Sequence, residues 1–338
     1  MSFVHLHVHS SYSVLDGLAS PKDLVKYTKE LGMDTLALTD HGTMFGTLDF
    51  FKTARAEGIK PIIGLETYMA PRSMHDKDVS RDKRAYHLLL LAKNMTGYKN
   101  LLKIATVSQL EGFYYHPRID RQFLADHTEG LIGTSACLAG EISKALEDND
   151  LAKAESALHW YKDAFGHDNF YLELQDHNIP ELYRVNRLVV ELAKKTNTPL
   201  VATNDVHYAR KEDADLQDIL LCIQTGKLLS DTNRMRMSDD SYYLRSPAEM
   251  RALFSQVPEA IENTLRIAEQ CEVDLTREGY HLPQFEVPGG ENPQNYLLNL
   301  CQEGLRRNIP DRADSEVVQE RLKYELGVIN RMGFAEYF

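Results

Sequence analysis

Short apolar runs alternate with segments of helical periodicity along most of this sequence. The apolar runs predict strands at residues 3–10, 35–42, 60–70, 86–94, 131–140, 169–177 and 199–209. Between them, apolar residues recur every three or four positions and predict helices, of which the longest covers residues 141–166. About seven strands in alternation with helices favour a parallel α/β sheet.

The alternation alone allows either an open doubly wound sheet or a closed barrel. Polar, titratable residues follow several different strands, in the segments HVHS, TDHG, GLE, SAC and NDVH. In a closed barrel the strand ends meet at one mouth, whereas the outer strands of an open sheet lie too far apart for that. We therefore predict a (β/α) barrel with about seven strands.

The pattern becomes purely helical after residue 210. Helices are predicted at 214–227, 247–254, 258–271, 295–307 and 316–334, and a segment rich in proline and glycine at 281–293 reads as a linker. We predict a barrel domain at residues 1–280, followed at 281–338 by a linker and a helical extension.

Composition excludes several classes of protein. Hydrophobic residues make up 43% and charged residues 26%, as in soluble globular proteins, and no apolar run is long enough to span a membrane. No secretory signal opens the sequence and the four cysteines form no CxxC pair, so a reducing cytoplasm is expected. The net charge of −12 argues against a general polyanion binder.

Three histidines alternate in the first predicted strand, at positions 5, 7 and 9. The period of two places His5, His7 and His9 on one face, which in a barrel is the interior. Taken alone, any one of them would more often be a packing residue. A strand rises about 3.3 Å per residue, so His5 lies roughly 13 Å from His9 and cannot share an ion with it. We assign His7 and His9 as ligands near the mouth and His5 as an interior histidine that is hydrogen-bonded to protein.

Further ligand-type residues stand at the other predicted strand ends. They are His41 of TDHG, Glu66 of GLE, His87 of YHLLLL, and Asp205 and His207 of NDVH. Imidazole and carboxylate groups bind zinc, manganese or iron. Because a barrel brings strand ends together, the set predicts a polynuclear metal site. Histidines without such a motif, among them His116 and His177, are expected on the surface or in packing.

Several of these segments resemble the PHP (polymerase and histidinol phosphatase) family, and most closely the PHP domains of bacterial replicative DNA polymerases. The resemblance rests on HLHVHSSYSVLDGL, LALTDHGTMFGTLDF, GIKPIIGLE, HLLLLAKNMTGYKNL and PLVATNDVHY, and it covers the whole sequence. NRMGFAEYF resembles the start of the polymerase region, so an N-terminal piece of a longer protein is expected. The family fold is a distorted seven-stranded (β/α) barrel with a trinuclear metal centre.

The resemblance implies nine metal ligands, one for each position of the family's motifs. They are His7, His9, Asp16, His41, Glu66, His87, Cys137, Asp205 and His207. Cys137 stands where the phosphatase relatives have a histidine, and every position holds a residue able to bind metal. Two of the nine have other readings, because Asp16-Gly17 could form only a turn and Cys137 could be a small buried hydrophobic residue. The expected cofactors are three divalent ions, zinc first, with manganese or iron as alternatives.

Two segments could contact nucleic acid or serve the fold alone. The loop at 72–84 carries five basic residues and three aspartates, and we favour a solvated loop over a phosphate contact. The segment FYYHPRID, residues 113–120, places three aromatic residues beside Arg118, which suits either stacking on a base or core packing.

The chemistry expected of such a centre is hydrolysis of phosphate esters by metal-activated water. Our first interpretation is a metal-dependent 3′→5′ exonuclease that proofreads, with Asp205, His207, His9 and Glu66 as catalytic residues. Its partners would be a single-stranded DNA 3′ end, the remainder of the polymerase subunit and an exonuclease subunit. The alternatives are a phosphomonoesterase of the histidinol-phosphatase type and a non-catalytic, metal-stabilised scaffold of the polymerase. No polymerase activity is expected, because on the resemblance that active site lies beyond Phe338.

Overall fold

The computed structural model describes residues 3–276 and 283–338 of the chain. The chain divides into two compact units, Met1–Leu275 and Thr276–Phe338. The domain boundary that we predicted after residue 280 lies outside the described residues. The second unit contains the two helices predicted there, α11 (Pro293–Asn308) and α12 (Glu316–Arg331), and two short turns of 3₁₀ helix, η2 (Pro288–Gly290) and η3 (Pro310–Arg312).

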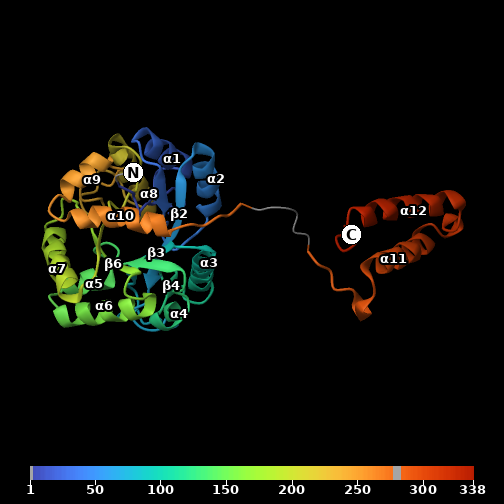
Figure 1. Ribbon diagram of the computed structural model, residues 1–338, viewed down its shortest axis with the longest axis horizontal. Coiled ribbons are helices and arrows are strands. Elements are labelled where there is room, and N and C mark those ends of the chain that lie inside the picture. Colours follow the sequence, from blue (N-terminus) through green and yellow to red (C-terminus); the bar gives the residue numbers. More distant parts are fainter. Residues whose placement is uncertain (1–2, 277–282) are drawn as a thin grey trace. The chain divides into compact units, whose positions relative to one another are not determined.

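The first unit is a curled sheet of seven strands surrounded by helices (Figure 1), as the sequence predicts. The strands are β1 (Thr35–Leu38), β2 (Lys60–Met69), β3 (Tyr86–Ala92), β4 (Arg118–Ile119), β5 (Leu131–Thr134), β6 (Phe170–Leu174) and β7 (Leu200–Ala202). Neighbouring strands follow the order β1-β2-β3-β5-β6-β7, and β4 pairs with the end of β2.

The sheet is mixed, and our prediction of a parallel sheet was wrong at one strand. β3 runs antiparallel to both of its neighbours, β2 and β5, while the other pairs are parallel. The reversal has a consequence for the site, because it brings the beginning of β3 to the edge where the parallel strands end. His87, the second residue of β3, thereby lies opposite Tyr68 of β2.

Residues 3–9 close the barrel between β1 and the segment that follows β7. His5 bridges to Leu36, Val8 bridges to Val206, and the amide of His9 donates to the carbonyl of Val206 at 2.8 Å. We predicted a regular strand here, but the pairing is limited to these isolated bridges. A side chain takes the place of one backbone hydrogen bond between the strands, because the amide of Val8 donates to the hydroxyl of Thr39 at 2.9 Å.

Each strand turns one face to the barrel interior and the other to the helices. The interior is filled near its base by a cluster to which most strands contribute one residue, including Ala37, Ile62, Leu91, Ile132 and Val201. Helix α10 (Pro258–Gln270) covers this cluster with Ile267. The opposite strand face packs with the helices in a larger apolar core.

The helices of the first unit largely match the predicted ones. They are α1 (Pro21–Glu30), α2 (Thr47–Glu57), α3 (Met95–Leu110), α4 (Arg121–Ala125), α5 (Glu141–Glu147), α6 (Leu151–Phe165), α7 (Pro180–Thr196), α8 (Ala214–Thr225), α9 (Pro247–Leu253) and α10, with the 3₁₀ turn η1 (Lys211–Asp213). Among the described residues, no helix is long and apolar enough to cross a membrane.

The long helix predicted at 141–166 is two helices, α5 and α6. The chain turns between them because Asn149 adopts a left-handed conformation with φ of 59°. Asp150 then caps α6, and its side chain accepts a hydrogen bond from the amide of Lys153 at 3.0 Å. A local side-chain cap of this kind competes with helix continuation.

The loop at 72–84 is held from beneath by Arg118 of β4. The Arg118 side chain is completely buried, and its guanidinium donates to the backbone carbonyls of Met74, Asp76, Asp82 and Gly112. On the loop itself, Arg72 forms two hydrogen bonds with the Asp82 carboxylate, of 2.6 and 3.0 Å. Arg118 is therefore engaged inside the fold, whereas Arg72 forms its ion pair on the exposed loop.

We predict that Arg118→Met destabilises the barrel, because it leaves buried carbonyls without a donor. The expected loss in the free energy of unfolding is about 3 kcal/mol. Trp160, the one tryptophan of the chain, lies on α6 and reports unfolding of this unit by its fluorescence in urea. Arg81→Met is the matched control, because Arg81 is exposed on the same loop. Equal unfolding midpoints for the two variants would contradict the structural role of Arg118.

Candidate metal centre

The nine predicted ligands come from seven parts of the barrel and meet at its mouth. His7 and His9 lie on the closing segment, Asp16 on the loop before α1, His41 after β1, Glu66 within β2, His87 at the start of β3, Cys137 after β5, and Asp205 and His207 after β7. Three groups of these residues each place ligand atoms within 4.8 Å of one another. The groups are His9–His41–His207, His7–His9–Glu66 and His41–Glu66–His87.

Glu66 is the carboxylate shared by two of these groups. Its Oε1 lies 3.4 Å from Nε2 of His7 and 2.9 Å from Nδ1 of His87. Its Oε2 lies 3.4 Å from Nε2 of His9 and 2.7 Å from Nδ1 of His41. Unlike the ligands that follow their strands, Glu66 lies inside β2, on the same strand face as Ile62 of the barrel interior.

Two further carboxylates flank the imidazoles. Oδ1 of Asp205 lies 3.2 Å from Nε2 of His7 and 3.3 Å from Nε2 of His9. Oδ2 of Asp16 lies 3.0 Å from Nε2 of His41 and 3.4 Å from Nε2 of His207. Every imidazole of the three groups therefore has a carboxylate oxygen within ion-pair distance.

The backbone is strained at several of these positions. Asp205 has φ of 46°, and Leu15 and Ala136, which precede Asp16 and Cys137, have φ of 63° and 56°. Residues other than glycine rarely adopt such angles, because the backbone strain is unfavourable. Strain of this kind is found mainly at functional sites.

Asp16 lies in a hydrogen-bonded turn that is tightly built against the barrel mouth. A Cβ on Gly17 would lie 2.0 Å from the carbonyl oxygen of Ser10, so only glycine fits beside it. The buried carboxylate of Asp40 accepts from the Ser10 amide at 2.7 Å and from the Ser13 hydroxyl at 2.8 Å. These contacts hold the loop against the barrel mouth.

Cys137 lies at the margin of the cluster. Its Sγ is 3.7 Å from Nδ1 of His87, and it belongs to none of the three groups. Burial, with the nearby carboxylates of Glu66 and Asp205, raises the pKa of the thiol well above its usual value. Only a bound cation would turn this thiol into a thiolate ligand at neutral pH.

His5 is the member of the histidine series that the structure keeps out of the cluster. We predicted that His5, His7 and His9 share one face, and this was wrong. The chain bends at His7, so that His5 pairs with Leu36 on the helix-facing side while Leu6 joins the interior cluster. Nε2 of His5 contacts the backbone carbonyl of Arg245 at 2.8 Å, which confirms a histidine that is hydrogen-bonded to protein.

Three histidines are oriented by partners on the side away from the cluster. Nδ1 of His7 is 2.7 Å from Glu173, and Nδ1 of His207 is 2.7 Å from the backbone carbonyl of Asp205. Nδ1 of His9 is 3.1 Å from the hydroxyl of Ser13, which in turn donates to Asp40. Since these acceptors take the Nδ1 proton, each ring directs its Nε2 toward the cluster, and Nε2 is the atom available to bind an ion.

Glu173 is the functional residue that the sequence reasoning missed. It is buried, and its carboxylate also accepts hydrogen bonds from Thr134, from Thr203 at 2.5 Å and from Gln175 at 2.9 Å. The alternation in FYLEL could have placed it on the interior face, but it follows no ligand-like motif. His177 was expected on the surface or in packing, and its buried ring stacks on Tyr242 at 3.8 Å.

Unsatisfied polar atoms test whether the residues suit metal ions. Six of the predicted ligands have a buried atom without a hydrogen-bond partner, namely His7 Nε2, His9 Nε2, Asp16 Oδ1, His41 Nδ1, Glu66 Oε2 and Asp205 Oδ1. Buried polar atoms are almost always paired in folded proteins, and an ion is one of the few explanations for exceptions. Nitrogen and oxygen donors in this combination suit divalent transition metals, so the residues fit such ions.

The electrostatics of the cluster also indicate that its residues suit divalent cations. Burial raises the pKa of Glu66, but the imidazoles of His87, His41 and His7 outweigh it and hold that pKa well below its usual value. Burial lowers the pKa of His7, yet the carboxylates of Asp205, Glu173 and Glu66 raise it overall. Protons thus hold the carboxylates together in the ion-free protein, and cations would displace them.

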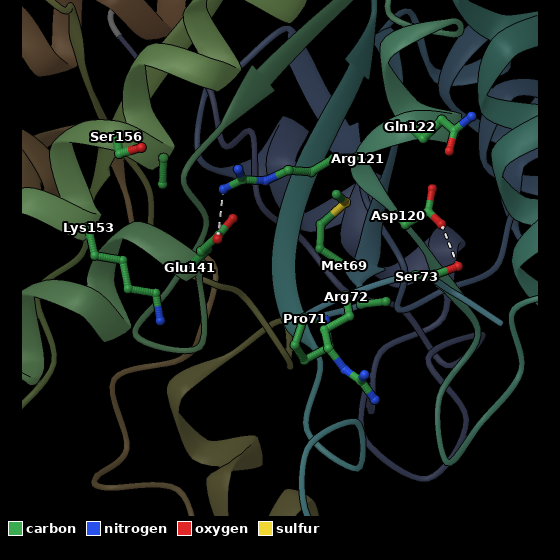
Figure 2. Close-up of a pocket in the computed structure, with 12 residues that line it drawn as sticks. Met69, Pro71, Arg72, Ser73, Asp120, Arg121, Gln122, Glu141, Lys153 and Ser156 are labelled. Atoms are coloured by element: carbon green, nitrogen blue, oxygen red, sulfur yellow. Dashed lines mark hydrogen bonds and ion pairs between the residues drawn. The ribbon is translucent and has the colours of Figure 1, made fainter. Parts of the chain in front are cut away.

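The cluster opens into a pocket of about 860 Å³. The ligands that line it are Asp16, His41, His87, Cys137, Asp205 and His207. A separate cavity of about 460 Å³ lies beside the end of β2 and contains none of the nine (Figure 2). Its charged groups are largely paired, because Arg121 donates to Glu141 at 2.8 Å and Ser73 to Asp120 at 3.3 Å.

Comparison with known proteins gives matches along the whole chain. The family profile described as "PHP domain" matches residues 5–177, and the profile described as "Bacterial DNA polymerase III alpha NTPase domain" matches residues 295–338. DNA polymerase III subunit alpha of Treponema pallidum is 47% identical over all of this chain, and that of Thermus aquaticus is 42% identical over 96% of it. The chain spans only 29% and 27% of the length of these two relatives.

Solved structures give a more distant likeness. An amidohydrolase from Chromobacterium violaceum superposes with a TM-score of 0.37 at 14% identity, over 60% of this chain and 87% of the other.

We predict that His9→Gln loses metal and that His5→Gln retains it. His9 belongs to two of the three ligand groups, whereas His5 lies on the other face of its segment. Glutamine can still donate to the Arg245 carbonyl, so we expect His5→Gln to cost only about 1 kcal/mol of stability. Metal content by elemental analysis and thermal unfolding of both variants test this. Equal metal loss in the two would mean that His5 is a ligand and that the bend at His7 is wrongly placed.

Proposed function

The chain belongs to the PHP domain family, and from this membership we propose that its barrel is a metal-dependent phosphoesterase acting as a 3′→5′ exonuclease on DNA. The observation that carries the proposal is the set of six buried ligand atoms that make no hydrogen bond, at the mouth of an open pocket. A structural metal site is closed, whereas a catalytic one keeps positions open to solvent and substrate.

The residues of the cluster divide into two layers. Asp16, His41, His87, Cys137, Asp205 and His207 line the pocket, while His7, His9 and Glu66 lie beneath it and are almost completely buried. We propose all nine as ligands of three ions, with zinc first. When bound, such ions polarise phosphoryl oxygens and lower the pKa of water.

The chain's own contribution is orientation and charge. Glu173, Ser13 and the Asp205 carbonyl accept the Nδ1 protons of His7, His9 and His207, so the three Nε2 atoms point toward the cluster and are available to bind ions. Asp205 and His207 reach the pocket surface and are proposed to contact the reacting phosphodiester. His9 and Glu66 are proposed as catalytic through the ions that they hold beneath it.

Similarity to a polymerase subunit favours DNA over a small phosphomonoester as substrate. For the longer protein we propose replication in the cytoplasm, with the remainder of the alpha subunit, a single-stranded DNA 3′ end and an exonuclease subunit as partners. A phosphomonoesterase would hydrolyse histidinol phosphate but not a labelled primer, and a pure scaffold would hydrolyse neither. Incubating the metal-loaded chain with each substrate separates the three functions.

We predict about three divalent ions per chain, mainly zinc, because the family resemblance implies a trinuclear centre and all nine of its ligand positions hold residues able to bind metal. Elemental analysis after purification without chelator measures this. A chelator should also lower the unfolding temperature, since ions that bind only the folded state stabilise it. Less than one ion per chain, or no effect of the chelator, would contradict the proposed centre.

We predict that Asp205→Asn reduces exonuclease activity without unfolding the barrel. The substitution keeps the shape of the side chain but removes a negative charge that lies 3.2 Å from His7 and 3.3 Å from His9. Loss of such a preorganised charge typically costs on the order of 10²–10³ in rate. Release of a labelled 3′ nucleotide measures the rate, and circular dichroism checks the fold.

Asp215→Asn is the matched control, because Asp215 is an exposed residue of α8 away from the cluster. It should cleave at the parent's rate. If Asp205→Asn cleaves as fast as this control, the observed hydrolysis does not come from the proposed centre.

A further inference from the structure

The pocket in front of the ligand cluster has an apolar and aromatic lining. Beyond the ligands, its lining includes Tyr68, Phe113, His116, Met235, Met237 and Tyr242, together with other apolar and uncharged polar residues. The lining, which lies entirely within residues 3–276, includes no lysine or arginine. A ligand of this pocket therefore needs a planar or apolar portion in addition to any phosphate.

A column of rings connects the buried centre with the surface of the pocket. His9 stacks on His41 at 4.0 Å, His41 faces Tyr68 at 6.1 Å, and Tyr68 stacks on His116 at 4.7 Å, with interplanar angles between 24° and 27°. His116 is the exposed outer ring of this column. A further planar group parallel to these rings would continue the stack.

Phe113 differs from the two aromatic residues that follow it. The rings of Tyr114 and Tyr115 each contact a cation of this chain, Arg118 at 5.1 Å and Lys83 at 5.3 Å. Phe113 instead lines the pocket with 51% of its surface exposed, and Met235, from the segment after α8, lines it with 53% exposed. Covering these two side chains with an apolar ligand face would remove both from water.

We propose that Phe113, His116 and Met235 form a subsite for the unpaired terminal base of a DNA strand. This rests on the proposed nuclease function and names the part of the substrate that the pocket recognises. An unpaired base offers two free faces for aromatic and thioether side chains, whereas a paired and stacked base does not. The pocket volume of about 860 Å³ is ample for one nucleotide with its phosphodiester at the ligand cluster.

The test compares strand ends with and without a base. The metal-loaded chain is given a 5′-labelled single-stranded oligonucleotide whose 3′-terminal nucleotide is either thymidine or an abasic nucleotide. Phe113→Ala should raise KM for the thymidine end about 5- to 150-fold, the loss typical of one stacked base. On the abasic end its KM and kcat should stay within about twofold of the parent's, because the missing contact was to the base. Met235→Ala should act in the same direction by a smaller factor.

Leu110→Ala is the matched control, since Leu110 is 79% exposed at the end of α3 and does not line the pocket. It should leave both KM values unchanged. If Phe113→Ala and Met235→Ala keep the parent's preference for the thymidine end, the subsite is wrong while the nuclease function stands.

A binding measurement separates the subsite from the nuclease function. A phosphorothioate-protected oligonucleotide with 2-aminopurine at its 3′ end reports base stacking by loss of fluorescence. Quenching by the parent that is lost in Phe113→Ala supports the subsite, even if no cleavage of any strand is observed. Absence of quenching by the parent, or equal quenching by both proteins, overturns it.

Discussion

The buried carboxylate of Glu66 lies within 3.4 Å of nitrogens of four histidines, and the rest of the site is arranged around this contact. The four imidazoles reach it from the closing segment, from the end of β1 and from the start of β3. A carboxylate taken out of water is costly unless charges and hydrogen bonds compensate it. The barrel mouth can therefore form only if these separate segments arrive together, which couples closure of the sheet to assembly of the ligand set.

Two further buried acids, Glu173 and Asp40, orient histidine rings of this cluster so that it can bind cations. Glu173 fixes the His7 ring, and Asp40 acts on His9 through Ser13. Because these acceptors hold protons at Nδ1, the ligand atoms need no rearrangement when ions bind. The positive φ of Asp205 has a related role. Rigid surroundings can maintain this unfavourable backbone angle, which directs the Asp205 side chain into the pocket.

The sequence allowed prediction of most of this arrangement, because ligand-type residues next to apolar runs are a local signal. The barrel and the convergence of the strand-end histidines with Glu66 could be predicted in this way, whereas Asp16 and Cys137 were assigned only through the family resemblance. What could not be predicted depends on contacts between distant segments. The bend at His7 turns His5 to the other face, and β3 is reversed between β2 and β5. Glu173 escaped notice because its role exists only once β6 lies beside His7.

The charge of the chain constrains how a DNA end could be held at all. The formal net charge is −12, and the pocket lining contributes no lysine or arginine, so the protein surface itself offers a phosphate backbone little attraction. Cations at the ligand cluster would supply the positive charge at one point, and exposed apolar side chains such as Phe113 would supply contact area at another. Such a division favours a single flexible end over a long tract of duplex, because only an end can place one phosphodiester and one base in the pocket together.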